Sequence, residues 1–256
     1  MKLLLVQPAL RAAPDADNLA TIREAVRGEA TVLASEDVLL LPEHVSPERV
    51  AERYEQGVGE LARALGCHVV GGSQHRERGG RVVNAGVACA PDGRVVGRYE
   101  KLRPYATERE AVSAGSRLGE FTIAGRPILV LVCADFWFAD LILTATRLPD
   151  LVLVPALSVT RKPTPDYSRA LWRHLAVARA YEYGVYVGIS DWAHRSQLPQ
   201  LAASGVGGLA DPTAIDPQEL FRPIGSASVA VHELDFGRLE AFRNDRRSRG
   251  FFWKPV

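Results

Sequence analysis

The sequence predicts a mixed α/β protein built in layers, and two features of the chain predict it. Short buried apolar runs alternate with segments of helical periodicity, which is typical of parallel strands joined by helices. Pairs of runs rich in strand-forming residues are joined by turn signals, which indicates antiparallel hairpins. The 256 residues contain no internal repeat, low-complexity segment or linker, so we expect a single domain over residues 1–256.

The first quarter of the chain alternates strands and helices. Apolar runs predict strands at residues 2–6, 37–41 and 67–70. Helical spacing predicts a helix over 17–27 that ends with Gly28 as its C-cap. Ser46 as N-cap and Pro47 as the first helical residue predict a second helix, which runs to about Leu65.

Two hairpins are expected in the middle of the chain. Residues 81–90 and 94–100 are joined by Pro-Asp-Gly, and residues 120–124 and 127–132 by Gly-Arg. Beyond them we expect helices over 135–147 and 167–183 and strands over 150–154, 184–190 and 226–234. Residues 193–225 carry few signals, and the tail from 236 combines a short helix with an aromatic end.

Composition excludes several classes of protein. The net charge is +1, from 31 basic and 30 acidic residues without charged blocks, so we expect no nucleic-acid partner and no membrane surface. No apolar run approaches the ~20 residues of a membrane span. The apolar run 3–6 is too short for a signal peptide. Three widely spaced cysteines form no disulfide framework, which favours a reducing, cytoplasmic location.

One apolar run, residues 128–132, ends abruptly at Cys133, and the helix expected over 135–147 follows directly. A cysteine between a buried strand and a helix N-terminus lies where backbone N–H groups and the helix dipole favour negative charge. Cys133 is therefore a candidate thiolate nucleophile. A free cysteine is more often a small buried core residue, and this stretch alone leaves that alternative open.

Glu43, Lys101 and Cys133 each lie just beyond the C-terminal end of an expected strand. Ligand sites of open α/β folds gather at that edge of the sheet. The three residues supply a base for a thiol, a positive donor for a developing oxyanion, and a nucleophile, which are the parts of an acyl-transfer site. Each also has an ordinary interpretation, as a solvated glutamate, a surface lysine and a core cysteine.

The segments around these residues resemble the motifs of the nitrilase, or carbon–nitrogen hydrolase, superfamily. LLLPEH at 39–44 resembles the strand followed by Pro-Glu, DGRVVGRYEKL at 92–102 the hairpin that carries the lysine, and VCADFWFAD at 132–140 the nucleophile motif. Further similar segments follow in family order: VVNAGVACAPDG (82–93), DLVLVPA (150–156), RAYEYGVYVGIS (179–190) and NDRRS (244–248).

The resemblance implies a four-layer αββα sandwich with two mixed β-sheets and a Glu–Lys–Cys triad. Cys133 would attack the carbon of a small amide, carbamoyl compound or nitrile, giving a thioester or thioimidate. Glu43 would move the protons, while Lys101 and the backbone N–H of Ala134 would stabilise the oxyanion. Glu108, rather than Glu110, would orient Lys101. No metal or organic cofactor is implied.

The resemblance also implies a homodimer, with the C-terminal segment, about 233–256, in the contact. Departures from the usual motif, Ala134 for tyrosine and Ala139-Asp140 for Pro-Glu, leave the triad intact but leave the substrate open. Candidate substrate contacts are Phe136, Trp137, Trp192 and Arg161, although Arg161 and Lys162 also fit a solvated loop.

Other histidines and cysteines have simpler interpretations. His174 and His194 have no companion at metal-ligand spacing, so no metal site is expected, and Cys67 and Cys89 are expected in the core. Two alternative functions remain: an acyltransferase or amide synthase on the same triad, and a catalytically silent binding protein of the same fold. A conventional Cys–His hydrolase finds no histidine with a supporting partner in the sequence.

Overall fold

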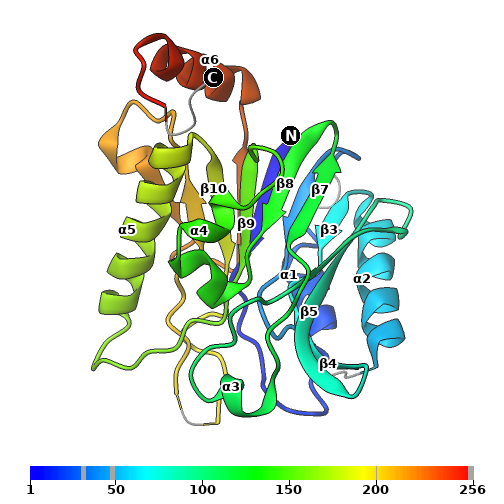
Figure 1. Cartoon of the computed structure of the whole chain (residues 1–256). Coiled ribbons are helices and arrows are strands. Elements are labelled where there is room, and N and C mark those ends of the chain that lie inside the picture. The colour runs from blue at the N-terminus through cyan, green and yellow to red at the C-terminus, as the bar shows by residue number, and fades with distance from the viewer. Residues whose placement is uncertain (30–32, 47–49, 200, 253–256) are drawn as a thin grey trace.

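In the computed structural model two β-sheets pack face to face, and helices cover their outer faces (Figure 1). The structure describes residues 1–29, 33–46, 50–199 and 201–252. The order of layers, α–β–β–α with both sheets mixed, confirms the expected sandwich. None of the helices in these ranges has the length and apolar content that a bilayer span requires.

The first sheet contains β1 (Lys2–Val6), β2 (Val38–Leu40), β3 (His68–Val70), β4 (Gln74–Arg78), β5 (Arg81–Cys89), β6 (Val95–Glu100) and β13 (Val229–Glu233). The second contains β7 (Gly119–Ile123), β8 (Arg126–Val130), β9 (Leu151–Pro155), β10 (Tyr186–Ser190), β11 (Gly208–Ala210) and β12 (Phe221–Pro223). The helices are α1 (Asn18–Ala25), α2 (Ala51–Leu65), α3 (Glu108–Ala111), α4 (Asp140–Leu143), α5 (Asp166–Tyr183) and α6 (Phe236–Ser248), with 3₁₀ turns η2 (Cys133–Trp137) and η3 (Pro217–Leu220).

Both sheets have parallel strands at their centres. The first runs in the order β13-β1-β2-β3-β5-β4, with β6 also paired to β5, and β1, β2 and β3 are parallel. The second runs β12-β11-β10-β9-β8-β7, with β8, β9 and β10 parallel. The two predicted hairpins are β5–β6 and β7–β8. Parallel strands bring their carboxyl ends to one edge, which is where the candidate catalytic residues lie.

The alternation of side chains in β1 divides the core into two parts. Leu3 and Leu5 belong to the cluster between the sheets, whereas Leu4 and Val6 belong to the cluster under α1 and α2. Gly188 in β10 lets the sheets approach closely, because a Cβ there would lie 2.7 Å from Leu3 Cδ2. Cys67 and Cys89 are fully buried, as expected of core cysteines.

The segment after Cys133 differs most from prediction. Instead of one helix over 135–147, the chain forms the 3₁₀ turn η2 and then the four-residue α4. Phe138 separates them in an extended conformation (φ −117°, ψ 132°) and exposes 55% of its surface, so it does not join the apolar face that the periodicity suggested. The positive φ of Cys133 and the hydrogen bonds of Asp135, described below, replace the regular helical start.

Smaller differences follow from weak sequence signals. Helix α1 ends at Ala25, and Gly28 has no left-handed C-cap role. The predicted start of α2 at Pro47 lies outside the described residues, and the described helix begins at Ala51 after Val50. β4 was not predicted because its sequence, QHRER, is polar. β11 and β12 were not predicted because each has only three residues.

Candidate active site

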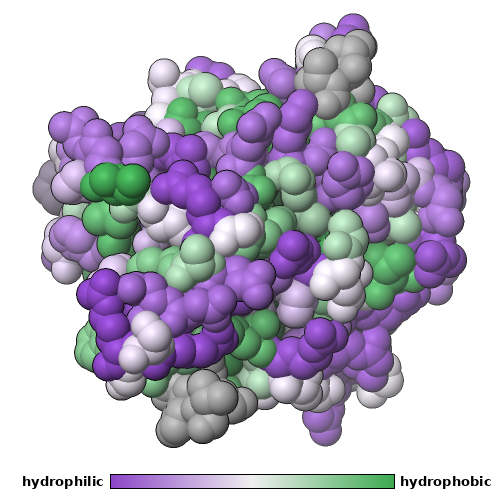
Figure 2. Space-filling view, turned by 90° about the horizontal axis from the view of Figure 1, so that it is seen from above, coloured by the Kyte–Doolittle hydropathy of each residue, from purple (hydrophilic) through white to green (hydrophobic). Residues whose placement is uncertain are grey.

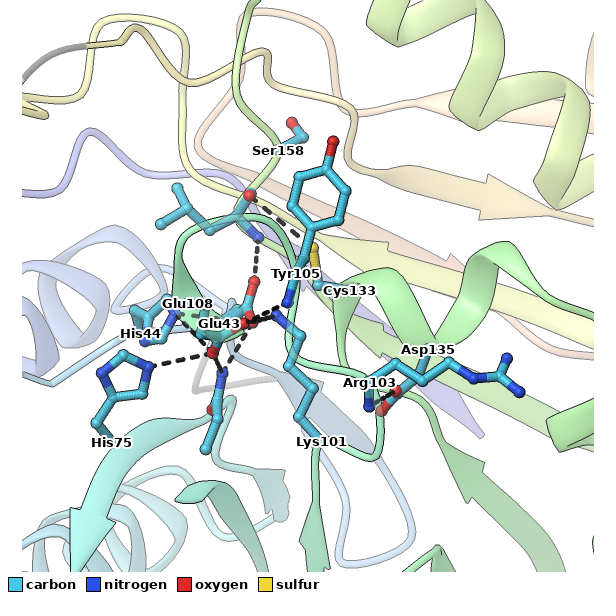
Figure 3. A network of polar contacts seen from close by, with 12 residues as sticks. Glu43, His44, His75, Lys101, Arg103, Tyr105, Glu108, Cys133, Asp135 and Ser158 are labelled. Atoms are coloured by element: carbon cyan, nitrogen blue, oxygen red, sulfur yellow. Dashed lines mark hydrogen bonds and ion pairs between the residues drawn. The ribbon is translucent and has the colours of Figure 1, made fainter. Parts of the chain in front are cut away.

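The ends of three strands bring the predicted residues to one buried place (Figure 3). Glu43 follows β2 and Lys101 follows β6, both in the first sheet, whereas Cys133 follows β8 in the second. Glu108 is the first residue of α3. The site therefore lies where loops from the two sheets meet, as the shared strand-end position predicted.

Lys101 lies between two carboxylates. Its Nζ donates to Glu43 Oε1 at 2.8 Å and to Glu108 Oε2 at 2.6 Å, and only 3% of its side chain is exposed. Burial favours the neutral amine, but the negative charges around it, that of Glu43 foremost, outweigh burial and raise the pKa of Lys101. The side chain is therefore a fixed ammonium at any physiological pH, suited to stabilising negative charge.

Glu43 is held at both carboxylate oxygens. Oε1 also accepts from Asn84 Nδ2 at 2.9 Å, and Oε2 accepts from the backbone N–H of Leu157 at 3.2 Å. The backbone carbonyl of Glu43 accepts from Trp192 Nε1 at 2.7 Å. These contacts leave the carboxylate little freedom to rotate, so its two oxygen atoms point in defined directions.

Glu108, and not Glu110, reaches the site. Oε2 accepts from the backbone N–H of Tyr105 at 3.0 Å, and Oε1 accepts from Asn84 Nδ2 at 2.9 Å and lies 3.1 Å from His75 Nε2. Burial would raise the pKa of Glu108, but the hydrogen bond from His75 and the charge of Lys101 hold it well below its usual range. Glu108 thus stays ionised and, with Glu43, gives the site two negative charges against one positive.

Cys133 has an unusual backbone and a neutral thiol. Its φ is +49°, a left-handed conformation that non-glycine residues rarely adopt and that lifts the side chain out of the strand line. Sγ lies 3.9 Å from the carbonyl oxygen of Leu157. Burial, and then the negative charge of Glu43, raise the pKa of the Cys133 thiol well above its ordinary value.

The structure does not supply the predicted reason for a thiolate at Cys133. The predicted cause was the dipole of a helix starting beside Cys133, but the five-residue 3₁₀ turn found there has little dipole to offer. Burial and the negative charge of Glu43 oppose ionisation of the thiol more than the charge of Lys101 favours it, so the pKa of Cys133 stays raised. The raised pKa favours the protonated thiol in this site.

Asp135 ties the turn η2 to the segment that directly follows Lys101. Its carboxylate accepts from the backbone N–H groups of Leu102 at 3.0 Å and Arg103 at 2.8 Å, directly after Lys101. Burial raises the pKa of Asp135 to about 6, although those hydrogen bonds oppose the rise. Asp135 thus fixes the distance between the segments that carry Lys101 and Cys133.

A front pocket of about 290 Å³ opens on Cys133 and Ala134. Its walls include the aromatic rings of Tyr105, Trp137 and Trp172, and its rim includes Arg161 and Lys162. The predicted contacts Trp137 and Arg161 are thus at the pocket.

The other two predicted substrate contacts are not in this pocket. Phe136 is fully buried and stacks on Trp172 at 6.1 Å, so it supports the wall from behind. Trp192 supports the backbone of Glu43 instead and lines a second cavity. Their aromatic character suggested that both residues line the pocket. Whether they do so depends on the direction of each side chain, which sequence spacing does not reveal.

This second cavity, which we call the rear cavity, has a volume of about 530 Å³ and is lined by His44, His75 and Trp192 among others. Leu157 lines both cavities. His44 follows Glu43 directly, and burial lowers its pKa despite the nearby carboxylate of Glu43. His75 projects from β4 toward Glu108 (Figure 3).

The site also contains four residues for which the sequence predicted no role, namely Asn84, His75, Leu157 and Asp135. Asn84 stands inside a strand segment that resembles a family motif, which was a usable signal for a buried amide. His75 lies in a strand that was not predicted. Leu157 acts through its backbone, for which side-chain identity gives no signal.

Comparison with known proteins assigns the family. The family model described as carbon-nitrogen hydrolase matches residues 3–230, so the chain belongs to the carbon–nitrogen hydrolase family. It is therefore an enzyme that hydrolyses non-peptide C–N bonds. The omega-amidase NIT2 of Danio rerio is 28% identical over 208 residues, covering 77% of this chain and 71% of that protein. The omega-amidase NIT2 of Mus musculus is 23% identical over 238 residues, covering 87% and 83%.

Solved structures agree with the fold. A variant of the amidase from Nesterenkonia sp. AN1, with acrylamide added at its active-site cysteine, is similar with a TM-score of 0.74 and 21% identity, covering 98% of this chain and 99% of that chain. Nit3 of Saccharomyces cerevisiae, a nitrilase-superfamily member, is similar with a TM-score of 0.77 and 20% identity, covering 96% and 93%. At these identities the likeness concerns the fold alone.

Proposed function

We propose that this carbon–nitrogen hydrolase cleaves the amide of a small acid through a thioester on Cys133. The observation that carries the proposal is the buried Lys101 ammonium, held between Glu43 and Glu108 in the same site as the Cys133 thiol. An ammonium stabilises developing oxyanion charge most strongly where water is excluded. A carboxylate in contact with it accepts and returns protons.

The proposed reaction has two halves. Glu43 takes the thiol proton while Cys133 Sγ attacks the amide carbon, and Lys101 and the backbone N–H of Ala134 stabilise the oxyanion. Glu43 then passes the proton to the departing ammonia, leaving the thioester. In the second half Glu43 takes a proton from water, which attacks the thioester, and the proton returns to the thiol as the acid leaves. Glu108 orients Lys101 throughout.

The front pocket supports a substrate class. Its volume of about 290 Å³ fits a small molecule, and its aromatic walls favour an aliphatic chain. Arg161 and Lys162 at the rim offer two cations to a carboxylate remote from the amide. The curated relatives named omega-amidases agree with an amide at the far end of an acid. We therefore propose monoamides of short dicarboxylic acids as substrates.

Matched substrate pairs test this proposal. Monoamides of four- and five-carbon dicarboxylic acids are compared with uncharged amides of equal length, and a carbamoyl amino acid and a nitrile complete the panel. We expect kcat/KM to favour the charged member by about tenfold or more, because a charge-assisted hydrogen bond contributes about 1.5 kcal/mol or more. Arg161→Gln should reduce that preference, whereas Arg173→Gln, in a different cavity, should retain it.

Intact mass measurement after rapid quenching tests the nucleophile. An acyl adduct is expected on wild-type protein and absent from Cys133→Ala, which should also lose turnover. Turnover at the wild-type rate by Cys133→Ala would refute the proposed mechanism. An added primary amine separates hydrolysis from acyl transfer, because only an acyltransferase would yield mainly the substituted amide.

We further propose a homodimer and a location in a reducing compartment such as the cytoplasm. Three free cysteines, one of them the proposed nucleophile, support the reducing compartment. Exposed apolar side chains on α4, α5 and after α6 support the dimer, namely Leu143, Tyr181 and Phe251. The aromatic tail also contacts its own subunit, since Phe251 packs against Arg246 at 4.9 Å.

A further inference from the structure

Two imidazoles and a carboxylate meet beside the rear cavity. His44 comes from the turn after β2, His75 from β4 and Glu108 from α3, so no short sequence motif contains them. His75 Nε2 lies 3.1 Å and His44 Nε2 3.9 Å from Glu108 Oε1. One ligand atom from each of the three residues lies within 4.8 Å of the other two. Figure 3 shows both rings directed toward the carboxylates, on the side away from Cys133.

The donor set and its spacing suit a transition-metal ion. Zinc binds two histidines and one carboxylate at about 2.0–2.2 Å, so its donors in a tetrahedral site stand about 3.4 Å apart. The two separations from Glu108 Oε1, 3.1 and 3.9 Å, bracket that value, and the limit of 4.8 Å for the whole set means that the donors would move closer together around an ion. An ion between the rings would replace the N–H of His75 as the partner of Glu108 Oε1, while the hydrogen bond from Asn84 uses the other lone pair of that oxygen.

The position also gives an ion access, room and a favourable charge. The side chains of His44 and His75 are 27% and 33% exposed and line the rear cavity of about 530 Å³, which has space for a water molecule as fourth ligand. Two carboxylates share one lysine in the neighbouring site, which leaves one uncompensated negative charge. Repulsion by Lys101 opposes binding, so we expect a weaker site than a structural zinc centre.

We propose that His44, His75 and Glu108 form a binding site for Zn²⁺ or a similar divalent transition metal, and that the bound ion inhibits the hydrolase. The ion binds the Glu108 carboxylate, which orients Lys101, and adds two positive charges on the side of that carboxylate opposite Lys101. The hydrogen bond from Lys101 to Glu108 is then weakened, and the proposed oxyanion site loses its geometry. The inhibition rests on the proposed function, whereas ion binding does not.

Binding is tested directly, without substrate. Isothermal titration calorimetry with Zn²⁺ uses untagged Cys133→Ala protein, which keeps the three ligands and removes the thiol. We expect one ion per chain, and binding at least about tenfold weaker when His44→Gln or His75→Gln is added, because even outer partners of metal ligands contribute about 10- to 100-fold. His174→Gln is the matched control, since His174 is an exposed histidine at a different cavity.

Folding and inhibition are checked separately. Glutamine keeps a side-chain donor for Glu108, and equal urea midpoints would show that the variants fold. Protein with Cys133 intact should lose activity with Zn²⁺ and regain it with EDTA, and His44→Gln should need at least about tenfold more ion for the same loss. No binding by Cys133→Ala, or equal binding by the histidine variants, would overturn the site. Binding without inhibition would overturn only the regulatory half.

Discussion

At the scale of single residues, Cys133 shows how neighbouring charge sets reactivity. Burial, and then the negative charge of Glu43, raise the pKa of its thiol, and Lys101, which also pairs with Glu43 and Glu108, does not offset them. A raised pKa means that the thiol is protonated at neutral pH, and that its ionised fraction grows by about tenfold per pH unit until the raised pKa is reached. In the proposed mechanism, the attacking thiolate would therefore arise together with proton transfer to Glu43.

This state predicts the pH dependence of alkylation. The rate of Cys133 modification by iodoacetamide, followed by intact mass, should rise throughout pH 6 to 9 without reaching a plateau. Cys67 and Cys89 are fully buried and should stay unmodified in native protein, and Cys133→Ala serves as the blank. A plateau with a midpoint below pH 7 would instead indicate a resting thiolate stabilised by Lys101.

Two tryptophans predicted as substrate contacts should separate in kinetics. Trp137 lines the front pocket, so Trp137→Ala should raise KM several-fold. Trp192 donates to the backbone of Glu43, so Trp192→Phe should lower kcat and leave KM within about twofold. The loss of that buried hydrogen bond should also lower the free energy of unfolding by about 1–3 kcal/mol. An effect of Trp192→Phe on KM alone would instead indicate that Trp192 contacts the substrate.

The sequence predicted Glu43, Lys101, Cys133 and Glu108 at the site because each follows a strand or lies in a segment that resembles a family motif. It did not reveal the partners that act across the fold. Asn84 joins Glu43 to Glu108 from β5, and Leu157 contacts Glu43 through its backbone. Such contacts depend on which strands become neighbours, and no spacing along the chain encodes that.

At the scale of elements, the turn after Cys133 is shaped by tertiary contacts more than by its own periodicity. Residues 135–147 have helical spacing, yet Asp135 directs its carboxylate to the backbone N–H groups of Leu102 and Arg103. Arg103 in turn contacts the ring of Phe138 at 4.7 Å and pairs with Asp140. Contacts with Leu102 and Arg103 therefore accompany two short helical turns in place of one helix. The periodicity of residues 135–147 alone cannot predict contacts with a distant part of the chain.

Asp135 gives this element a measurable pH dependence. Its pKa is about 6 in the fold against an ordinary value of 3.8, so the folded state binds its proton more tightly than the unfolded state does. Its contribution to stability is therefore full below pH 4 and falls as pH rises to 6, by about 3 kcal/mol at most. Asp135→Asn cannot titrate and lacks this fall.

Urea unfolding at pH 4, 5, 6 and 7 measures the effect. The free energy of unfolding of wild type minus that of Asp135→Asn should decrease between pH 4 and 6 and then level off. Taking the difference removes the opposite trend of carboxylates with lowered pKa, such as Glu108. A difference that stays constant or increases over this range would contradict a raised pKa for Asp135.

At the scale of the whole molecule, the sandwich was predictable because its strands are apolar and its hairpins carry clear turns. β1, β9 and β10 are buried along their whole length or nearly so, as continuous apolar runs predicted. The pairing of strands was not predictable: β13 lies beside β1 although more than 220 residues separate them, as Lys2 opposite Glu233 shows. The face in Figure 2 carries many hydrophilic side chains, with smaller apolar areas between them.

The proposed dimer concerns the outer side of the second sheet. Leu143 on α4, Tyr181 on α5 and Phe251 after α6 each expose half or more of their surface. The guanidinium of Arg246 lies against the rings of Tyr181, at 4.7 Å, and Phe251, at 4.9 Å, which joins α5 to the chain after α6. Exposed apolar residues on adjacent elements are typical of a surface that another chain covers.

Charge placed on this surface should separate the subunits. Wild-type protein is expected to sediment at twice 27.9 kDa at micromolar concentration, whereas Leu143→Glu and Tyr181→Glu should shift it toward 27.9 kDa, because a buried unpaired carboxylate opposes association. Val50→Glu, next to α2 on the outer side of the first sheet, adds the same charge and should leave the dimer intact. Wild-type protein that sediments as a monomer would refute the dimer. A dimer that survives both substitutions would move its interface away from α4 and α5.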